Sequence, residues 1–352
     1  MEDVLVGGGG PAGLATAIRA AERGLEPVLV EPRTPPIDKA CGEGLMPAAV
    51  HALRTIGVEL SEGYPFRGIR YLDAADATCS ATGDFGDRAG RGVRRTDLQR
   101  AMWRRARQTG VEVRCDRVRT VTPLDGAVAV DLAEGGTRVA RYLVAADGLH
   151  SEVCEQVGLE PTDRGARRFG VRRHYARSAW SDRVEVHLAD RGEAYVTPIG
   201  EGMVGVALLA DGGGRFDDLI EGFPVLQRRL ADADAVTDDR GAGPFDRRIE
   251  SPRTGRVLAV GDAAGYLDAL TGEGIAIGVE TGIAAADCVA AGRPEAYPPR
   301  YRRTTRTYWW VTAALLSIVR HRPLHRPLIH VLDVAPGVFD AALELIGGAP
   351  EG

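Results

Sequence analysis

The stretch DVLVGGGGPAGLATAIRAAERGLEPVLVEP, residues 3–32, predicts a strand, a glycine turn, a helix and a second strand. Residues 4–6 form a short apolar run that is typical of a buried strand. Residues 15–23 carry apolar side chains at helical spacing, and PVLVEP at 27–32 is a second buried strand. This order of elements predicts a βαβ unit.

The glycines of the turn follow the pattern Gly8-x-Gly10-x-x-Gly13, and Glu31 ends the second strand. In such a pattern Gly8 makes a tight turn, Gly10 lets the backbone approach a pyrophosphate, and Gly13 lets helix and strand pack closely. The helix N-terminus attracts an anion, and Glu31 can accept hydrogen bonds from ribose hydroxyls. The pattern predicts a dinucleotide site; the alternative is a glycine-rich turn that binds nothing.

Composition and charge argue against several classes of protein. The chain has 352 residues, of which 44% are hydrophobic, and can bury a large core. Its 44 basic and 49 acidic residues give a net charge of −5, so we expect no nucleic-acid partner. The five cysteines form neither a CxxC pair nor a cluster with zinc spacing, and we expect neither disulfides nor a metal. The acidic start runs straight into a strand and predicts no signal peptide, hence a cytoplasmic protein.

Further along the chain the hydrophobic pattern changes twice. Residues 168–209 alternate between apolar and polar over four segments, which predicts an antiparallel sheet with one buried face. Residues 66–93 predict a small antiparallel piece, and residues 95–110 an amphipathic helix that ends at Gly110. Residues 256–291 return to a buried strand followed by a helix of small residues. The predicted fold class is α/β with α+β character.

Two more strand ends carry candidate site residues. The segment YLVAADGLHSEV, residues 142–153, ends a strand at Asp147-Gly148 and places Ser151 three residues on. A second apolar strand ends at Gly261-Asp262, before a helix that starts near Gly274. The Asp262 carboxylate can bond a ribityl hydroxyl, and the helix N-terminus can hold positive charge against an anionic reduced flavin. Each motif alone could be an ordinary end of a strand.

Together, Gly8-x-Gly10-x-x-Gly13, Asp147-Gly148-x-x-Ser151 and Gly261-Asp262-Ala263-Ala264 resemble the motifs of the aromatic-hydroxylase superfamily of FAD enzymes, the para-hydroxybenzoate hydroxylase fold. DKACGEGLMP (38–47) and GDAAGYLDALTGEGI (261–275) are most similar to the geranylgeranyl-reductase-like branch and to flavoprotein hydroxylases of phenolic and polyketide lipids in secondary metabolism. The resemblance spans residues 3–290. It implies a Rossmann-like FAD-binding domain (1–65, 92–165 and 250–295), an interleaved antiparallel-sheet substrate domain (66–91 and 166–249) and a C-terminal helical cap (296–352).

The resemblance also implies a set of FAD-binding residues. Cys41 and Gly42 would lie next to the flavin ring, where glycine lets the loop pass close to it. Arg95, at the start of a helix, would reach the FAD phosphates or ribityl chain; the alternative is a solvated arginine. The full implied set is Gly8, Gly10, Pro11, Ala12, Gly13, Glu31, Arg33, Cys41, Gly42, Arg95, Val118, Asp147, Asp262, Gly272, Gly274 and Ile275.

One position departs from the resembling family. The Asp-Gly motif there closes with an arginine, whereas this chain has Cys154. The family ties this segment to both FAD and NAD(P)H, so NAD(P)H is the expected electron donor, with a separate flavin or ferredoxin reductase as the alternative partner.

The reaction type is resolved only in part. A halogenase of this family would carry Trp-x-Trp-x-Ile-Pro and an archaeal prenyl reductase Tyr-x-Trp-x-Phe-Pro, whereas this chain has Glu193-x-Tyr195-x-Thr197-Pro198. We expect an FAD-dependent monooxygenase that uses O₂ and a flavin C4a-hydroperoxide to hydroxylate a hydrophobic aromatic, phenolic or polyketide-type substrate. The alternatives are an FAD-dependent ene reductase of a prenyl or polyketide lipid and a flavin-containing sensor without enzyme activity.

The candidate catalytic residues are Cys41, His174, Glu185, His187 and Tyr195. A base that removes a phenolic proton would favour hydroxylation, and histidine suits that role at neutral pH. Glu185 and His187 share one face of the predicted sheet, which His174 and Tyr195 could join; the alternative is a solvent-facing side. Cys41 would tune or shield the flavin ring, or else only pack in a glycine turn.

The C-terminal segment is basic and contains two tryptophans. Residues 296–332 hold no acidic side chain, and seven arginines surround an apolar stretch that includes Trp309 and Trp310. Such a helix can lie on an anionic membrane and deliver a lipid-like substrate, which predicts peripheral contact with the inner face of the membrane through residues 300–330. The alternative is a cap packed on the FAD domain.

Overall fold

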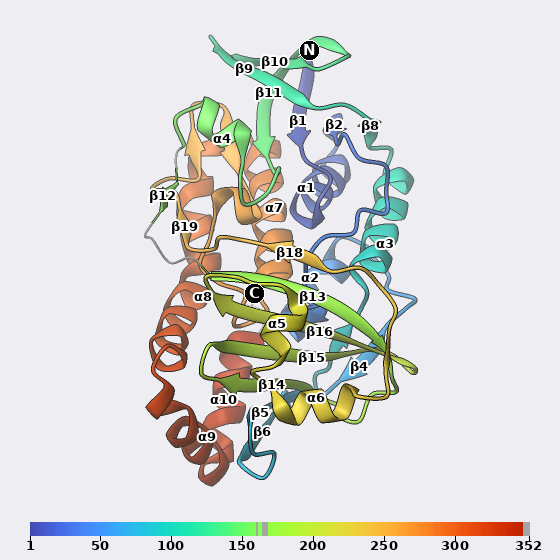
Figure 1. The fold of residues 1–352 in the computed structure, drawn as a ribbon. Helices are drawn as coiled ribbons and strands as arrows, with labels where there is room; N and C mark the ends of the chain where they lie inside the picture. Colours follow the sequence, from blue (N-terminus) through green and yellow to red (C-terminus); the bar gives the residue numbers. More distant parts are fainter. Residues whose placement is uncertain (160, 164–167, 348–352) are drawn as a thin grey trace.

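Two eight-stranded sheets form the framework of the computed structural model, which describes residues 1–159, 161–163 and 168–347 (Figure 1). The expected α/β class with a Rossmann-like sheet, an interleaved antiparallel-type sheet and C-terminal helices is confirmed. The expected boundary between residues 165 and 166, and the cap residues 348–352, lie outside the described residues.

The first sheet has the order β20-β21-β11-β1-β2-β8, with the hairpin β9-β10 paired to the long strand β11. Its central strands are parallel, as the βαβ pattern predicts. The strands are β1 (Glu2–Gly7), β2 (Pro27–Val30), β8 (Glu112–Arg114), β9 (Val118–Leu124), β10 (Ala127–Leu132), β11 (Gly136–Ala145), β20 (Arg253–Thr254) and β21 (Val257–Ala259).

Helices α1 (Pro11–Glu22) and α7 (Gly274–Ala290) pack closely beside this sheet. A side chain at Gly282 of α7 would place Cβ 2.6 Å from the Ala12 carbonyl oxygen, so only glycine allows this approach. Helix α3 (Arg95–Gln108) follows the predicted amphipathic segment and buries Leu98, Met102 and Ala106 against the same core. Smaller elements nearby are α2 (Pro47–Thr55), α4 (Glu152–Gln156), η1 (Gly261–Ala264) and η2 (Pro294–Ala296).

The second sheet has the order β17-β13-β16-β15-β14-β5-β6, with β18 paired to β13. The small antiparallel piece predicted from residues 66–93 contributes β5 and β6 to this sheet, where β5 pairs antiparallel with β6 and parallel with β14. The strands are β5 (Gly68–Asp73), β6 (Ser80–Asp84), β13 (Arg168–Ala176), β14 (Val184–Ala189), β15 (Gly192–Gly200), β16 (Met203–Asp211), β17 (Asp234–Ala235) and β18 (Arg240–Ala242).

Two three-stranded sheets connect the large ones. The first joins β12 (Thr162–Asp163), β19 (Arg247–Arg248) and β22 (Gly265–Tyr266); the second joins β3 (Gly44–Leu45), β7 (Gly90–Gly92) and β4 (Tyr64–Phe66). A buried ion cluster reinforces the connection, because the Arg168 guanidinium lies 2.6 Å from Glu193 Oε2 and 2.8 Å from Asp268 Oδ2. This cluster ties the second sheet to the loop that precedes α7.

The C-terminal segment packs as a cap along one side of the molecule (Figure 1). It comprises α8 (Tyr297–Val319), η3 (Arg322–Leu324), α9 (His325–Val334) and α10 (Pro336–Gly347). The Tyr301 and Tyr308 hydroxyls donate to the carbonyls of Ala264 and Asp268, which fixes α8 to the loop after β21. Trp310 is 75% exposed, and membrane contact through residues 300–330 stays a prediction. None of the described helices combines the length and hydropathy needed to cross a bilayer.

The outer face of the second sheet carries Glu185 and His187, covered by α5 (Phe216–Ile220) and α6 (Pro224–Leu230). The Trp180 indole donates to Glu185 at 2.8 Å, and Arg229 of α6 lies 2.9 Å from the same oxygen. Burial alone would raise the pKa of Glu185, but His187, Trp180 and Arg229 outweigh burial and lower it to about 2. These contacts give Glu185 a structural role.

We predict that Glu185→Gln lowers the free energy of unfolding by about 2 kcal/mol at pH 7, since the variant leaves a buried cationic environment without its carboxylate. The folded pKa lies below the usual 4.5, so this stabilisation is complete above that pH and is lost as the pH falls toward 2. Denaturant titrations across this range would measure it, with exposed Glu201→Gln as the matched control. A difference between wild type and variant that stays constant from pH 7 to pH 3 would contradict the assignment.

Candidate functional site

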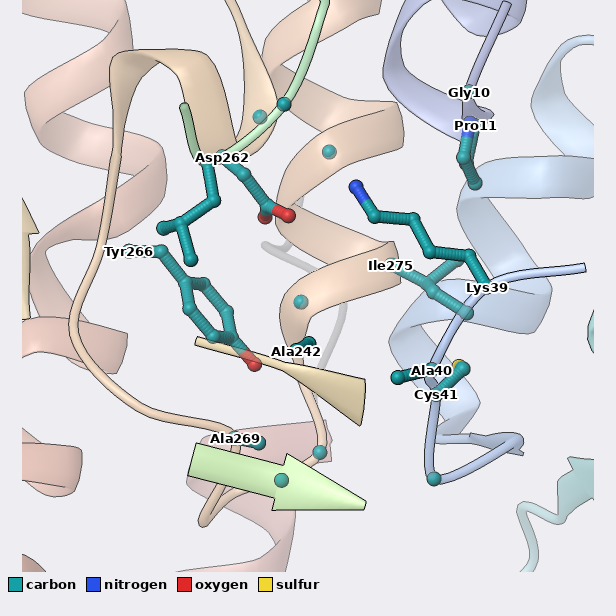
Figure 2. Close-up of a pocket in the computed structure, with 18 of the residues that line it drawn as sticks. Gly10, Pro11, Lys39, Ala40, Cys41, Ala242, Asp262, Tyr266, Ala269 and Ile275 are labelled. Carbon is teal, nitrogen blue, oxygen red and sulfur yellow. The ribbon is translucent and has the colours of Figure 1, made fainter. Parts of the chain in front are cut away.

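A cavity of about 810 Å³ lies between the two large sheets and extends under the C-terminal helices. One end is formed by the glycine turn after β1, the loop at residues 37–46 and the loop from Val260 to Thr271. The other end is formed by the inner face of the second sheet together with α8, α9 and α10. Figure 2 shows Gly10, Lys39, Cys41, Asp262 and Ile275 arranged around the first end.

The glycine turn presents backbone rather than side chains to the cavity. Gly8 has φ of +113°, and a Cβ there would lie 2.4 Å from the Ala146 carbonyl oxygen. A Cβ at Gly13 would lie 1.9 Å from the Gly8 carbonyl oxygen, whereas Gly10 faces open space. Pro11 begins α1 and Ala12 lines the cavity beside it. The N–H groups at this helix N-terminus can therefore reach an anion that approaches past Gly10.

Glu31 is held at the end of β2 by three groups. Its carboxylate accepts the Gly9 N–H at 2.9 Å, the Arg33 N–H at 3.0 Å and the Arg33 guanidinium at 2.8 Å. Burial would raise the pKa of Glu31, but the hydrogen bonds from Arg33 and Gly9 outweigh it and leave the pKa below its usual value. A stable carboxylate in this position can accept hydrogen bonds from a ribose.

Arg95 is buried at the cavity wall and is not the solvated arginine of the alternative interpretation. Its Nη1 has no hydrogen-bond partner among the described residues, and burial lowers the pKa of the guanidinium. A buried unpaired cation is costly unless a ligand pairs with it. Together with the open N-terminus of α1, this orphaned group fits a dinucleotide phosphate.

Two carboxylates and one lysine face each other across this end of the cavity. Burial raises the pKa of Asp262, an effect that the positive charges of Lys39 and Arg95 only partly offset. Asp147 accepts the Ser151 hydroxyl at 2.5 Å, which leaves it beside the cavity as a fixed acceptor. Figure 2 shows the Lys39 side chain extended toward Asp262. This charge balance suits a ligand with both hydroxyls and phosphates.

The remaining implied FAD residues also line the cavity. Val118, Cys41, Gly42, Gly272, Gly274 and Ile275 all contribute to its wall. Gly272 has φ of +69°, and Gly274 begins α7. Because Gly274 and Cys41 both line the cavity, the N-terminus of α7 and the loop that carries Cys41 face the same space. Burial raises the pKa of the Cys41 thiol.

The five catalytic candidates do not converge on one point. Cys41 and Tyr195 line the cavity, but the Tyr195 hydroxyl donates to the Leu270 carbonyl at 2.9 Å. Val184 and Val186 face the cavity, so Glu185 and His187 between and beyond them point to the opposite side of the sheet. The expectation that these two residues act at the site is wrong, and neither is solvent-facing, because both are buried.

His174 is on the cavity face of the sheet but is covered by Glu43. His174 is not one of the described residues that line the cavity, so a role as a base on a bound substrate does not fit this structure. Its strand neighbour Arg172, two residues away, does reach the cavity.

Several polar residues at the cavity wall were not predicted from the sequence, Tyr71 among them. Gln99 donates to the Gly9 carbonyl at 2.7 Å and accepts the Ile37 N–H at 2.7 Å, which positions the glycine turn. Glu43, Arg172 and Lys39 also lie at the cavity wall. The composition of the sequence singles out Lys39, because it is the one lysine among the 44 basic residues and the other 43 are arginine.

The comparisons with known proteins agree with this geometry. The menaquinone reductase of Mycobacterium tuberculosis is 29% identical over 313 residues, covering 81% of this chain and 76% of that protein. The digeranylgeranylglycerophospholipid reductase of Methanosarcina acetivorans is 27% identical over 335 residues, covering 86% and 81%. The fold is similar to that of p-nitrophenol 4-monooxygenase PnpA from Pseudomonas putida, with a TM-score of 0.84 and 18% identity, covering 100% of this chain and 99% of that one.

The family profile described as "FAD binding domain" matches residues 1–207, which is more than half of the chain. These residues contain the glycine turn, Glu31, Arg95 and Asp147, whose geometry fits a dinucleotide. The chain therefore belongs to this family of FAD-dependent oxidoreductases.

Proposed function

We propose that this protein is an FAD-dependent reductase that saturates a carbon–carbon double bond in a long, apolar, lipid-like substrate. The observation that supports this most is the second end of the cavity, which is apolar and has no carboxylate or imidazole in its described wall. Its side chains come from the second sheet, from the cap and from Met46 just before α2: Met46, Ile69, Tyr71, Val184, Val186, Val311, Leu315, Leu328, Leu332, Phe339, Ala342 and Leu343.

An apolar wall of this kind binds a hydrocarbon chain by excluding water from it. The similarity to proteins named as reductases of menaquinone and of digeranylgeranylglycerophospholipid supports the same substrate class, since both names denote molecules with long prenyl chains. Bound FAD, once reduced, would supply the hydride equivalent for the reduction. NAD(P)H is the electron donor we propose.

Reduction of an alkene also needs a proton, and two groups on the cavity wall can donate one. Burial keeps the Cys41 thiol protonated by raising its pKa. Burial likewise raises the pKa of Tyr71 to about 12, so its hydroxyl stays protonated at the cavity wall. Tyr195 is a poorer donor because its hydroxyl is already committed to a backbone carbonyl.

Hydroxylation of a phenolic or polyketide-type substrate with O₂ is the second candidate function. The Tyr71 hydroxyl at the cavity wall favours it, because this group could hydrogen-bond to a ring oxygen. No histidine or carboxylate from the described wall at this apolar end could remove the phenolic proton, which makes it the weaker candidate.

Alkene reduction and hydroxylation can be distinguished by their products. With FAD-loaded enzyme, a chemical reductant and a prenyl quinone or prenyl lipid, we expect a product heavier by two hydrogens under strictly anaerobic conditions. Mass spectrometry of the extracted product measures this. A product that forms only with O₂ and is heavier by one oxygen would overturn the proposal and establish hydroxylation.

Substitution of each side chain distinguishes the two candidate proton donors, Cys41 and Tyr71. If Cys41 donates the proton, we expect Cys41→Ala to lower turnover by about 10²-fold; if Tyr71 donates it, we expect the same loss in Tyr71→Phe. FAD binding is retained in both variants. Steady-state rates together with the flavin absorption spectrum measure this. Tyr195→Phe, which removes a hydroxyl that already donates to the Leu270 carbonyl, is the control. Wild-type turnover in both variants and in the double variant would show that neither group supplies the proton.

The position of the FAD can be tested at Lys39 without any turnover. Because the chain has a single lysine, an amine-selective acylating reagent can modify only Lys39 and the α-amino group. We expect saturating FAD to slow acylation of Lys39 by at least about tenfold, since the ligand would occupy the space into which this side chain extends. Peptide mass spectrometry measures both rates, and the α-amino group is the internal control. Equal Lys39 rates with and without FAD would contradict the placement.

A further inference from the structure

A buried carboxylate–imidazole pair lies at the cavity wall, with Glu43 in the wall and His174 behind it. Glu43 Oε2 is 2.5 Å from His174 Nε2, and each side chain is only 1% exposed. Glu43 belongs to the loop at residues 38–44, which carries Lys39 and Cys41 into the cavity, whereas His174 belongs to β13 of the second sheet. The contact therefore connects this loop, which lies at the FAD-binding end of the cavity, to the second sheet.

The same carboxylate holds a third segment. Glu43 Oε1 accepts the Arg95 N–H at 2.7 Å, and the Glu43 carbonyl accepts the Val93 N–H at 2.9 Å. Arg95 is the first residue of α3 and carries the orphaned guanidinium that faces the cavity. One side chain thus fixes the loop and the start of α3 relative to the sheet.

The backbone at Glu43 is strained, and the neighbouring chain leaves room for its side chain. Glu43 has φ of +60°, a left-handed conformation that costs a non-glycine residue about 1 kcal/mol. On the facing strand, a Cβ at Gly205 would lie 3.2 Å from Glu43 Oε2, so glycine accommodates the carboxylate. Strain of this kind persists only where surrounding contacts determine the conformation, and here those contacts are the bonds to His174 and Arg95.

The groups around the imidazole set the direction of its hydrogen bonds. Arg172 Nη1 lies 3.2 Å from His174 Nδ1, and the Thr237 hydroxyl lies 3.0 Å from the same atom. A guanidinium can only donate, so Nδ1 accepts from Arg172 and Nε2 carries the hydrogen that is donated to Glu43. Arg172 is itself paired with Asp38 at 2.5 Å, at the other end of the loop. Both ends of the loop are therefore held to β13.

We propose that Glu43 and His174 are positioning residues that hold the 38–44 loop closed against the second sheet, and that this closure sets the place of the Cys41 thiol and of Arg95 at the flavin-facing wall. The Glu43 N–H also donates to the Cys41 sulfur at 3.3 Å, so displacement of Glu43 displaces the thiol directly. The placement at a flavin rests on the proposed function, whereas the closure of the loop does not.

The test uses the accessibility of Cys41 as a readout. In the FAD-loaded full-length protein, we expect His174→Leu and Glu43→Gln to raise the rate of Cys41 alkylation by iodoacetamide by about tenfold, because loss of a buried charge-assisted hydrogen bond favours the open loop. Peptide mass spectrometry follows each cysteine separately. Cys154 and Cys288, both buried in the core, should react as slowly as in the wild type.

Two further variants separate positioning from general stability. His174→Gln retains an N–H donor and should restore slow alkylation of Cys41. His187→Leu removes the other buried histidine of the same sheet, on its opposite face, and should leave Cys41 unchanged. An unchanged Cys41 rate in His174→Leu would overturn the proposal. So would a rise at Cys41 that occurs only together with Cys154 and Cys288, since that would show loss of the whole fold.

The dissociation constant of FAD from the apoprotein gives a second readout. We expect it to rise about tenfold in His174→Leu, since Arg95 loses its fixed position, and to remain unchanged in His187→Leu. Failure to reduce any alkene would disprove the proposed function and leave the alkylation result intact. The two proposals are thus independently falsifiable.

Discussion

The site depends on a backbone-to-backbone contact that only glycine permits. A Cβ at Gly13 would meet the Gly8 carbonyl at 1.9 Å, and a Cβ at Gly8 would meet the Ala146 carbonyl at 2.4 Å. The first strand, the first helix and the end of β11 are thus packed with no side chain between them. This packing leaves the N-terminus of α1 exposed to the cavity, and it determines where Glu31 and Asp147 lie around it.

The second half of the site is built from parts far apart in the sequence. Strands β5 and β14 pair in parallel although more than 100 residues separate them, and α9 and α10 pack against β5 and β6. Their apolar side chains close a chamber that continues directly from the dinucleotide end of the cavity. One cavity therefore joins a polar, phosphate-compatible region to a hydrocarbon-compatible region, as the proposed reduction of a lipid by FAD requires.

Much of the first half could be predicted from the sequence because its signals are local. The spacing of Gly8, Gly10 and Gly13 and the strand end at Glu31 each reflect short-range geometry, and all four residues lie at the cavity or in the turn that forms its wall. Alternation along 184–188 correctly predicted that Glu185 and His187 share a face, but a period of two cannot say which face is covered by helices. Here α6 covers the face that carries Glu185 and His187, and Arg229 and Trp180 donate hydrogen bonds to the Glu185 carboxylate.

His174 shows a different limit. It is on the cavity side of the sheet, yet Glu43, 131 positions earlier, covers it, and no local pattern predicts that contact. The charge of Arg95 was anticipated, whereas its burial and its unpaired nitrogen became visible only in the folded chain. Lys39 could have been found from composition alone, because a lone lysine among 43 arginines is conspicuous in the sequence itself.

The proposed function requires that one cavity holds the flavin at its polar end and a hydrocarbon chain at its apolar end. A crystal structure of the FAD-loaded protein with a long-chain prenyl compound tests this most directly. We expect FAD against the glycine turn, Arg95 and Asp262, with the prenyl chain between Val184, Val186 and Leu332. A prenyl chain bound elsewhere, or FAD extending through the apolar end and filling it, would show that this cavity does not bind a lipid substrate beside the flavin.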